Sequence, residues 1–359
     1  MSFLELQQLK KVFPDGTEAV KGIDLHAEAG EFVVLLGPSG CGKTTTLRMI
    51  AGLEMPTSGR IAIAGRNVTM LRPSERDVGF VFQFYALYPH LSVAQNIGFP
   101  LEAAGVRRAE RDERVRAVAR SMGLLPLLEC YPRQLSGGDQ QRVSLARAVV
   151  RHPAIFLMDE PLGTLDADQR LEMREFIRGR QQEMKVTTIY VTHDQEEAMS
   201  LADRIVVMQG GTICQAGPAA EVYDDPASLF VANFVGSPGM NFIPGHVRAH
   251  GGRCVFMPDR AQTPIPLKAS IAPGPATLGI RPEFLHASPQ GPISGTVVMN
   301  EYQGSFRSIH IDAGFTGTIA MRAGESSRLQ PGQKIRLDLD AAHARFFDTQ
   351  SGRRIGHAI

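Results

Sequence analysis

Eight consecutive residues, 37–44, constrain the fold of this chain more than any other feature. They read Gly-Pro-Ser-Gly-Cys-Gly-Lys-Thr. An apolar run typical of a buried strand, 32–36, precedes them, and a helical pattern extends from them to Gly52. The glycines let successive backbone N–H groups turn toward a phosphate, and the helix N-terminus adds partial positive charge. The sequence therefore predicts a nucleotide-phosphate loop between a strand and a helix.

The residues of this loop have distinct expected roles. We expect the ammonium group of Lys43 to hold the β- and γ-phosphates of ATP, and the hydroxyl of Thr44 to ligate Mg²⁺. Two interpretations stay open for Cys41: it fills space, or it is a site where thiol modification blocks entry of the nucleotide. The residues expected to bind ATP here are Gly37, Pro38, Ser39, Gly40, Cys41, Gly42, Lys43, Thr44 and Thr45.

Composition limits the classes of partner. The 359 residues predict two or three domains. Lys+Arg 38 against Asp+Glu 37 gives no excess charge that would attract nucleic acid or anionic lipid broadly. No apolar stretch approaches the roughly 18–20 residues of a membrane helix, and the start lacks the apolar centre of a signal peptide, so we expect a cytosolic chain. The four cysteines lack C-x-x-C spacing, which argues against a zinc site.

The pattern of elements changes along the chain. Up to about residue 217, β-rich runs alternate with helical stretches, which predicts an α/β fold with a parallel sheet. These runs are 32–36, 79–82, 155–158, 188–191 and 205–208. Between 91 and 152 the strands stop, which indicates a helical insertion.

The last third of the sequence has a different character. One more helix is expected over 226–235, followed by a turn-rich boundary at 236–239. Short strand-like segments follow at 296–299, 308–311 and 334–339, typical of a small β barrel or sandwich, with two similar short barrels as the alternative. The sequence thus predicts a nucleotide-binding domain over 1–235 and an all-β domain over 236–359.

Polar residues follow three of the expected parallel strands. Asp159 and Glu160 end one strand, and because side chains alternate along a strand, the two carboxylates are expected to point in different directions. Asp159 then serves Mg²⁺, while Glu160 faces the attacking water as a general base or polariser. Gln83 is expected to reach Mg²⁺ or this water, and His193 to contact the γ-phosphate, since ligands of open α/β sheets bind at these strand ends. Taken alone, such acids are as often plain caps or turn residues.

A second candidate phosphate site lies in the helical insertion. The run Leu-Ser-Gly-Gly-Asp at 135–139 precedes a helix. A hydroxyl and glycine N–H groups at a helix start bind anions. A second phosphate site, made of Ser136, Gly137, Gly138 and Asp139, implies that two chains share each nucleotide.

In their order and spacing, these motifs resemble those of the ATP-binding-cassette (ABC) ATPases. The resemblance implies an α/β P-loop ATPase domain with a helical subdomain at about 91–152. It also implies a head-to-tail dimer, in which Ser136 of one subunit closes on the ATP held by Lys43 of the other. Phe13 matches the family's aromatic residue that stacks on adenine.

The match is closest to the importer ATPases of the maltose and related sugar-uptake type, through residues 82–90 and 278–283. This resemblance implies an OB-type regulatory domain at the C-terminus and an ATP-hydrolysing subunit for import of a sugar, polyol or glycerol phosphate. The implied partners are two transmembrane permease subunits, a second ATPase subunit of the same or another kind, and, indirectly, an extracytoplasmic solute-binding protein. The implied location is the cytoplasmic face of the inner membrane, and no nucleic acid is expected.

The chain departs from the family pattern in two places. The run 135–139 corresponds to the signature motif of the family, and Asp139 stands where this signature usually has Gln. Gly163-Thr164 stand where Ser before Asn or Ser is usual. These changes are expected to tune or lower turnover, or to reflect pairing with a non-identical ATPase. The alternatives are a cassette ATPase acting on nucleic acid or ribosomes and a weakly active, regulatory half of an ATPase pair.

Overall fold

The computed structural model describes residues 2–250, 253–259, 263–267, 271–315 and 317–357. The chain packs as two units, residues 1–219 and 220–359. Both halves of the expected fold class, an α/β ATPase part with helices and an all-β part, are confirmed.

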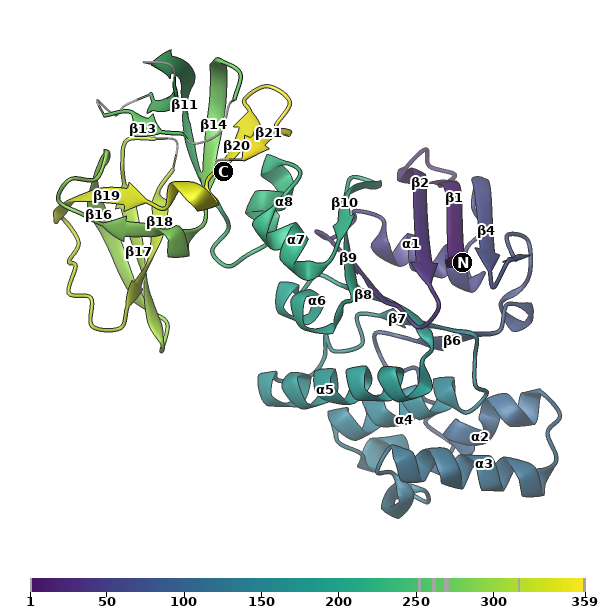
Figure 1. Cartoon of the computed structure of the whole chain (residues 1–359). Coiled ribbons are helices and arrows are strands. Elements are labelled where there is room, and N and C mark those ends of the chain that lie inside the picture. The colour runs from purple at the N-terminus through teal and green to yellow at the C-terminus, as the bar shows by residue number, and fades with distance from the viewer. Residues whose placement is uncertain (1, 251–252, 260–262, 268–270, 316, 358–359) are drawn as a thin grey trace. The chain divides into compact units, whose positions relative to one another are not determined.

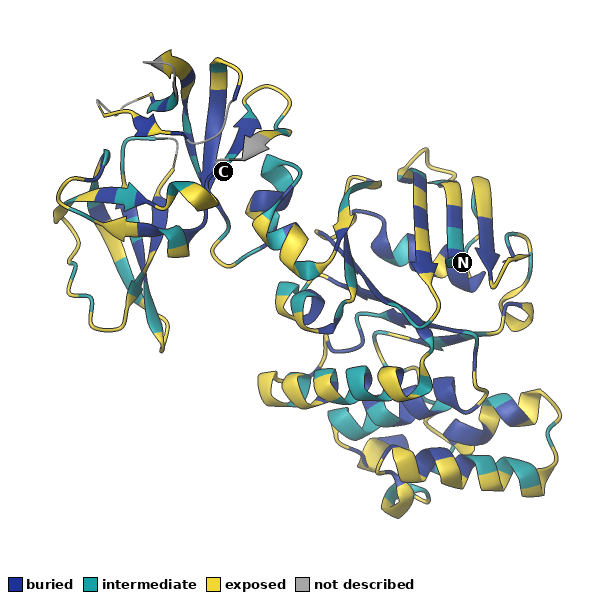
Figure 2. Cartoon of the chain, viewed as in Figure 1, coloured by how far each residue is buried: buried dark blue, intermediate teal, exposed yellow. Residues whose placement is uncertain are grey.

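The first unit is built around a six-stranded sheet with the order β10-β9-β3-β8-β7-β6 (Figure 1). Five of these strands are parallel, and β10 is an antiparallel edge. The central strands are buried along their whole length because both faces are covered, which explains their unbroken apolar sequence (Figure 2). The bounds are β3 Phe32–Leu36, β6 Val78–Val81, β7 Ile155–Asp159, β8 Thr187–Thr192, β9 Arg204–Gln209 and β10 Thr212–Gly217.

A second, antiparallel sheet was not predicted. Its order is β2-β1-β4-β5, with β1 Ser2–Val12, β2 Glu18–Glu28, β4 Ser58–Ile63 and β5 Arg66–Asn67. Leu4, Leu6 and Leu9 of β1 share one apolar core with Val33 of β3 and Leu47 of helix α1 (Lys43–Ala51). The helix that follows the glycine-rich loop is therefore packed in the centre of the unit.

The helical insertion consists of α2 (Val93–Ala103), α3 (Arg108–Ser121) and α4 (Gly137–Val149). Ser92 caps α2 in a capping box with Gln95, and Ser136 caps α4 by accepting a hydrogen bond from the Asp139 backbone N–H. Helices α5 (Ala167–Met184) and α6 (Gln195–Leu201) complete the unit. Among the described residues, no helix combines the length and apolar character needed to cross a membrane.

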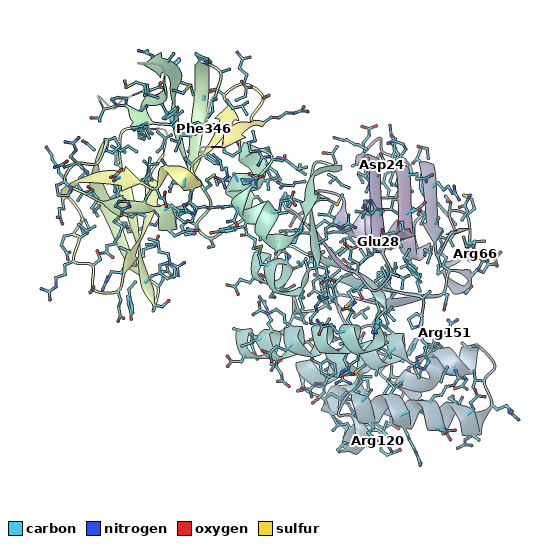
Figure 3. All side chains as sticks on the ribbon, viewed as in Figure 1. Asp24, Glu28, Arg66, Arg120, Arg151 and Phe346 are labelled. Atoms are coloured by element: carbon cyan, nitrogen blue, oxygen red, sulfur yellow. The ribbon has the colours of Figure 1, made fainter. Side chains whose placement is uncertain are left out.

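The second unit is antiparallel throughout its two sheets, which have the orders β13-β12-β11-β14-β20-β21 and β15-β19-β16-β17-β18. Inward-facing side chains of both sheets share one core, which includes Phe346 (Figure 3). The strands are β11 Asn241–His250, β12 Arg253–Pro258, β13 Ile265–Pro266, β14 Gly274–Ile280, β15 Leu285–Ala287, β16 Ile293–Tyr302, β17 Phe306–Asp312, β18 Ile319–Gly324, β19 Lys334–Leu339, β20 Arg345–Asp348 and β21 Arg354–His357.

The division at 219/220 lies N-terminal to the boundary expected from the sequence, 235/236. Helix α8 (Leu229–Phe234) lies within the range 226–235 that was expected to be helical, and a second short helix, α7 (Ala219–Asp224), precedes it and was not predicted. They pack with the β-rich unit because the buried Arg281 donates hydrogen bonds to the carbonyl oxygens of Tyr223, Ala232 and Val235.

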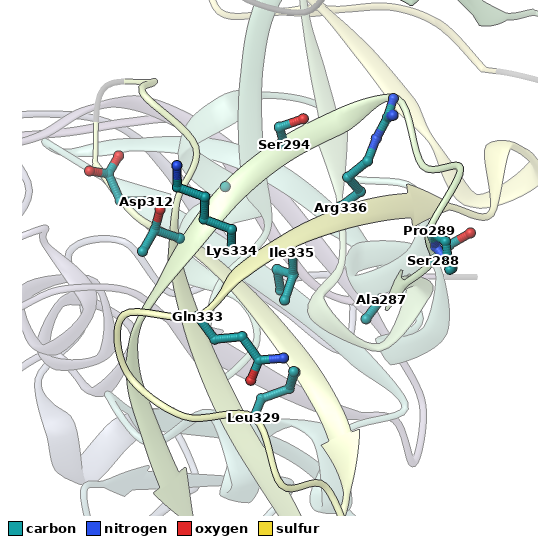
Figure 4. Close-up of a pocket in the computed structure, with 12 residues that line it drawn as sticks. Ala287, Ser288, Pro289, Ser294, Asp312, Leu329, Gln333, Lys334, Ile335 and Arg336 are labelled. Atoms are coloured by element: carbon teal, nitrogen blue, oxygen red, sulfur yellow. The ribbon is translucent and has the colours of Figure 1, made fainter.

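The β-rich unit also has an open hollow of about 760 Å³ (Figure 4). Its polar lining includes Ser294, Thr296, Asp312, Lys334 and Arg336. None of the residues expected to bind nucleotide belongs to this unit.

Candidate nucleotide-binding site

The glycine-rich loop joins β3 to α1, as expected, and its backbone requires glycine at two points. A side chain at Gly42 is excluded twice over: its φ is +104°, and an added Cβ would lie 2.4 Å from the carbonyl oxygen of Ala19. At Gly37, an added Cβ would lie 2.4 Å from the carbonyl oxygen of Met208. Close approach to two neighbouring strands therefore fixes the path of the loop.

Within the loop, Pro38, Ser39 and Gly40 are exposed, while Thr44 and Thr45 are half-buried at the start of α1. The Lys43 side chain is only 5% exposed, and its Nζ donates to the carbonyl oxygens of Gly37 (2.7 Å) and Pro38 (3.0 Å). The loop thus holds a fixed positive charge beside its exposed tip, a combination that suits a polyphosphate.

The Cys41 thiol lies in the apolar core of the first unit and is 2% exposed. Such burial favours the space-filling interpretation over the one in which a reagent reaches the thiol.

Two oxygen-bearing side chains that could ligate Mg²⁺ lie together at the C-terminal end of the loop. The Thr44 hydroxyl donates to Asp159 Oδ1 at 2.9 Å. Burial raises the pKa of the Asp159 carboxyl, and the hydrogen bond from Thr44 partly offsets this effect. In the described part of the chain, no group of three His, Cys, Asp or Glu side chains could form a metal cage. Mg²⁺ needs none, because it binds through one or two protein oxygens together with substrate phosphates and water.

Glu160 lies at the centre of a second cluster. Gln83 Nε2 donates to Glu160 Oε2 at 3.1 Å, and His193 Nδ1 lies 3.2 Å from Glu160 Oε1. Glu160 has a φ of +42°, which a non-glycine residue rarely adopts. Asp159 faces Thr44 whereas Glu160 faces Gln83 and His193, so three strand ends bring these side chains to one edge of the sheet.

The signature residues form a different arrangement. The Ser136 hydroxyl donates to Asp139 Oδ2 at 2.7 Å and accepts from the Asp139 backbone N–H at 3.1 Å. Arg142 Nη1 contacts Asp139 Oδ1 at 3.3 Å. Among the hydrogen bonds and ion pairs of the described residues, none joins 136–139 to the glycine-rich loop.

Among the interactions of the described residues, none joins Phe13 to the cluster around Glu160. It is half-buried in the turn between β1 and β2, and Lys11 Nζ lies 5.1 Å from the centre of its ring.

Two polar residues near the site, Tyr85 and Arg147, had no expected role, and Tyr85 contacts Thr164, one of the residues at which the chain departs from the family pattern. The Tyr85 hydroxyl and the Thr164 Oγ1 are hydrogen-bonded at 2.6 Å, and Arg147 of α4 donates to the carbonyl oxygens of Tyr85 and Ala86. Tyr85 and Ala86 both have positive φ values, 54° and 49°. No local sequence signal indicates this conformation, because neither residue is glycine or asparagine.

Three family models match the chain: ABC transporter over residues 20–163, MalK OB fold domain over 236–285 and TOBE domain over 278–347. The chain is 48% identical to an sn-glycerol-3-phosphate import ATP-binding protein of Agrobacterium fabrum, over 99% of this chain and 95% of that protein. It is 45% identical to a protein of the same description from Burkholderia mallei, over 99% and 100% of the two chains.

Solved structures resemble about 60% of the chain. A dimeric ATP-binding cassette bound to ADP and Pi matches 60% of this chain and 98% of its own, with a TM-score of 0.55 and 31% identity. The protein cbiO1 of Clostridium perfringens, part of an ABC transporter complex, matches 62% and 90%, with a TM-score of 0.58 and 30% identity. Full-length similarity to import ATP-binding proteins, together with a nucleotide-phosphate loop and an OB-type second unit, shows that the chain belongs to the ABC-importer ATPases and is an ATP-binding, ATP-hydrolysing subunit of that family.

Proposed function

We propose that this chain drives import of a glycerol-phosphate-class solute by hydrolysing MgATP in a head-to-tail dimer at the cytoplasmic face of the membrane. The observation that carries the proposal is the position of Glu160, whose carboxylate is held between Gln83 and His193 while Asp159 and Thr44 lie beside the phosphate loop. The names of the full-length relatives, which are glycerol-3-phosphate import proteins, support the choice of solute.

Each side chain of the site has one role in this proposal. Lys43 and the loop N–H groups bind the β- and γ-phosphates, and Phe13 stacks on the adenine. Glu160 accepts a hydrogen bond from the attacking water and orients it, with Gln83 and His193 fixing the carboxylate. His193 is 60% exposed, so its ring can turn from Glu160 toward the γ-phosphate.

The oxygens of Thr44 and Asp159, together with the side-chain oxygen of Gln83, are the ligands proposed for Mg²⁺. When bound, the ion neutralises charge that develops on the phosphate oxygens.

The second copy completes each site in this proposal. Ser136, Gly137, Gly138 and Asp139 lie at the N-terminus of α4, where backbone N–H groups and the helix dipole favour an anion. These residues make no hydrogen bond or ion pair to the phosphate loop among the described residues, which supports a role on the nucleotide of a partner subunit.

A groove in the first unit supports permease subunits as partners. It has a volume of about 580 Å³ and lies between the parallel-sheet edge and the helical insertion. Leu53, Phe82 and Phe99 line it and are each about 40% exposed, an unusual density of large apolar surface. Arg147 and Arg151 form its polar side, and Arg151 is visible in Figure 3. We propose that a short amphipathic helix of a permease subunit fills this groove, one for each of two ATPase subunits.

Trapping tests the hydrolytic part of the proposal. In Glu160→Gln, the amide keeps the shape of the side chain but cannot act as a base, so we expect hydrolysis to fall at least about 100-fold while MgATP binding persists. Light scattering on the purified full chain should then show an ATP-dependent dimer. A monomer at saturating MgATP, or hydrolysis at the wild-type rate, would contradict the proposal.

A measurement of uptake tests the identity of the transported solute. The chain is reconstituted in proteoliposomes with its permeases and solute-binding protein, and uptake of labelled glycerol 3-phosphate is measured with wild type and with Glu160→Gln as the inactive control. We expect ATP-dependent uptake that excess maltose does not reduce. Uptake of a neutral sugar or polyol instead would refute the solute and leave the ATPase roles intact.

A further inference from the structure

One segment of the first unit, residues 82–88, contributes both to the groove and to the cluster around Glu160. Phe82, Ala86 and Tyr88 line the groove proposed for the permease, and Gln83 donates to Glu160. Between them, Tyr85 and Ala86 are held in left-handed backbone conformations. Such conformations persist only where the surroundings hold them.

Helix α4 holds this backbone. The Tyr85 carbonyl oxygen accepts from Ser144 Oγ (3.0 Å) and Arg147 Nη2 (2.9 Å), and the Ala86 carbonyl oxygen accepts from Arg147 Nη1 (2.6 Å). Burial lowers the pKa of Arg147 without removing its charge at neutral pH, so these are charge-assisted hydrogen bonds. Helix α4 is the same helix whose N-terminus carries the signature residues.

The Tyr85 side chain points the other way, to the loop that follows Glu160. Its hydroxyl lies 2.6 Å from Thr164 Oγ1. That loop is a compact turn, in which the Gly163 N–H donates to the Glu160 carbonyl at 3.2 Å and the Leu165 N–H donates to the Leu162 carbonyl at 3.2 Å. A displacement of Thr164 is therefore transmitted to Glu160 rather than absorbed between them.

The two segments thus meet at two points: Gln83 with Glu160, and Tyr85 with Thr164. A single contact would let one segment pivot about the other, whereas two contacts fix their relative orientation. The second contact depends on Thr164, one of the two positions at which this chain departs from the family pattern.

We propose that the Tyr85–Thr164 hydrogen bond is a positioning link, through which occupation of the groove by a permease sets the orientation of the Glu160 carboxylate. The inference rests on the proposed docking of a permease in this groove. It assigns a role to two residues that belong neither to the phosphate loop nor to the lining of the groove. Removal of the link should reduce the stimulation of hydrolysis by the assembled transporter more than it reduces hydrolysis by the isolated chain.

The test is a double-mutant cycle with Tyr85→Phe, Thr164→Val and the combined variant, measured in two forms of the protein. The first form is the transporter assembled with its permeases and loaded solute-binding protein in proteoliposomes, and the second is the isolated full chain. For each single variant we expect the ratio of the two kcat values to fall roughly fivefold, the size expected for loss of one hydrogen bond. We expect the KM for ATP to stay within twofold, because neither residue lies in the phosphate loop. The combined variant should lose no more than either single one.

Two further variants separate the link from a general structural effect. Thr164→Ser keeps the hydroxyl and should restore the wild-type ratio. Tyr131→Phe, which removes an exposed tyrosine hydroxyl from the helical insertion, is the matched control and should leave the ratio unchanged.

The outcomes also distinguish this inference from the proposed docking. Additive losses in the combined variant, or equal losses in the isolated chain and in the transporter, would overturn the link. If assembly does not stimulate wild-type hydrolysis at all, the docking proposal itself fails. Strong wild-type stimulation that Tyr85→Phe leaves intact refutes only the link.

Discussion

Asp139 is the residue at which the signature of this chain departs from the family pattern, and its contacts account for how a carboxylate is tolerated there. Arg142 pairs with one of its oxygens, and the N-terminus of α4 adds partial positive charge. Repulsion of an incoming phosphate is therefore weakened. The Ser136 hydroxyl, however, donates to the other oxygen, which competes with any phosphate for the same hydrogen bond.

Replacement of Asp139 by Gln should release this hydroxyl. We expect Asp139→Gln to lower the KM for ATP in the dimer, or raise kcat, by roughly threefold, in keeping with one hydrogen bond exchanged between partners. Steady-state ATPase assays of the full chain measure both constants. Glu172→Gln is the matched control, because Glu172 also pairs with Arg142 but has no contact with Ser136 in the described structure. Equal rates for wild type and Asp139→Gln would show that the departure does not tune turnover.

At the scale of elements, the end of β8 and the start of α6 are joined by a buried pair. The Tyr190 hydroxyl of β8 donates to Glu197 Oε2 of α6 at 2.8 Å, and both side chains are almost fully buried. Asp194 caps α6 by accepting from the backbone N–H groups of Glu196 and Glu197. The pair and the cap together fix the chain on both sides of His193.

This pair predicts a pH dependence of stability. Burial raises the pKa of Glu197 above the ordinary glutamate value of 4.5, while hydrogen bonds from Thr192 and Tyr190 oppose the shift. The folded state therefore binds the proton more tightly than the unfolded state. The stabilisation is complete below about pH 4.5 and is lost as pH rises through the raised pKa.

Glu197→Gln lacks this titration but can still accept the Tyr190 hydrogen bond. In urea titrations, we expect the free energy of unfolding of wild type, relative to Glu197→Gln, to decrease from pH 4 to pH 7. The exposed Glu196→Gln on the same helix should show no such change. A difference that is constant or increases with pH would contradict the raised pKa.

The elements also show what the sequence could predict. Parallel strands such as β3 were found within about one residue, since a strand buried on both faces is an unbroken apolar run. Strand β1 was missed because its buried residues, Leu4, Leu6 and Leu9, change phase at a bulge where Gln8 has a φ of +45°. Irregularity of this kind removes the alternation that identifies a half-buried strand.

At the scale of the whole molecule, the order of motifs along the chain predicted the fold class and the family, because each motif lies at a strand end or helix start that the α/β topology brings together. The Gln83–Glu160–His193 cluster could be expected in this way. Its link to Tyr85 and Thr164 could not, since it depends on a left-handed backbone at Tyr85 and Ala86. The packing of α7 and α8 with the β-rich unit was missed for another reason: it depends on Arg281, a charged residue that a sequence places at the surface by default.

The buried position of Arg281 predicts that its substitution lowers the stability of the second unit and leaves that of the first unchanged. Its side chain is 2% exposed, donates to carbonyl oxygens of Tyr223, Ala232 and Val235, and lies 4.0 Å from the centre of the Tyr223 ring. Arg281→Leu would leave three carbonyl groups near the ends of α7 and α8 without this donor. The Ala232 carbonyl keeps the hydrogen bond from the Met240 N–H, but each buried polar group that loses its partner costs about 1–3 kcal/mol, so we expect the second unit to lose roughly 2–3 kcal/mol of stability.

Calorimetry of the full chain measures this effect, because two units with separate cores can unfold in separate transitions. We expect Arg281→Leu to lower the transition of the β-rich unit and to leave that of the ATPase unit, and the KM for ATP of the isolated chain, unchanged. Arg322→Leu is the control: this exposed arginine also stacks on an aromatic ring, Phe306 at 3.8 Å, but it should cost less than about 1 kcal/mol. If Arg281→Leu shifts both transitions together, the chain unfolds as one cooperative unit, and the division at 219/220 does not describe its stability.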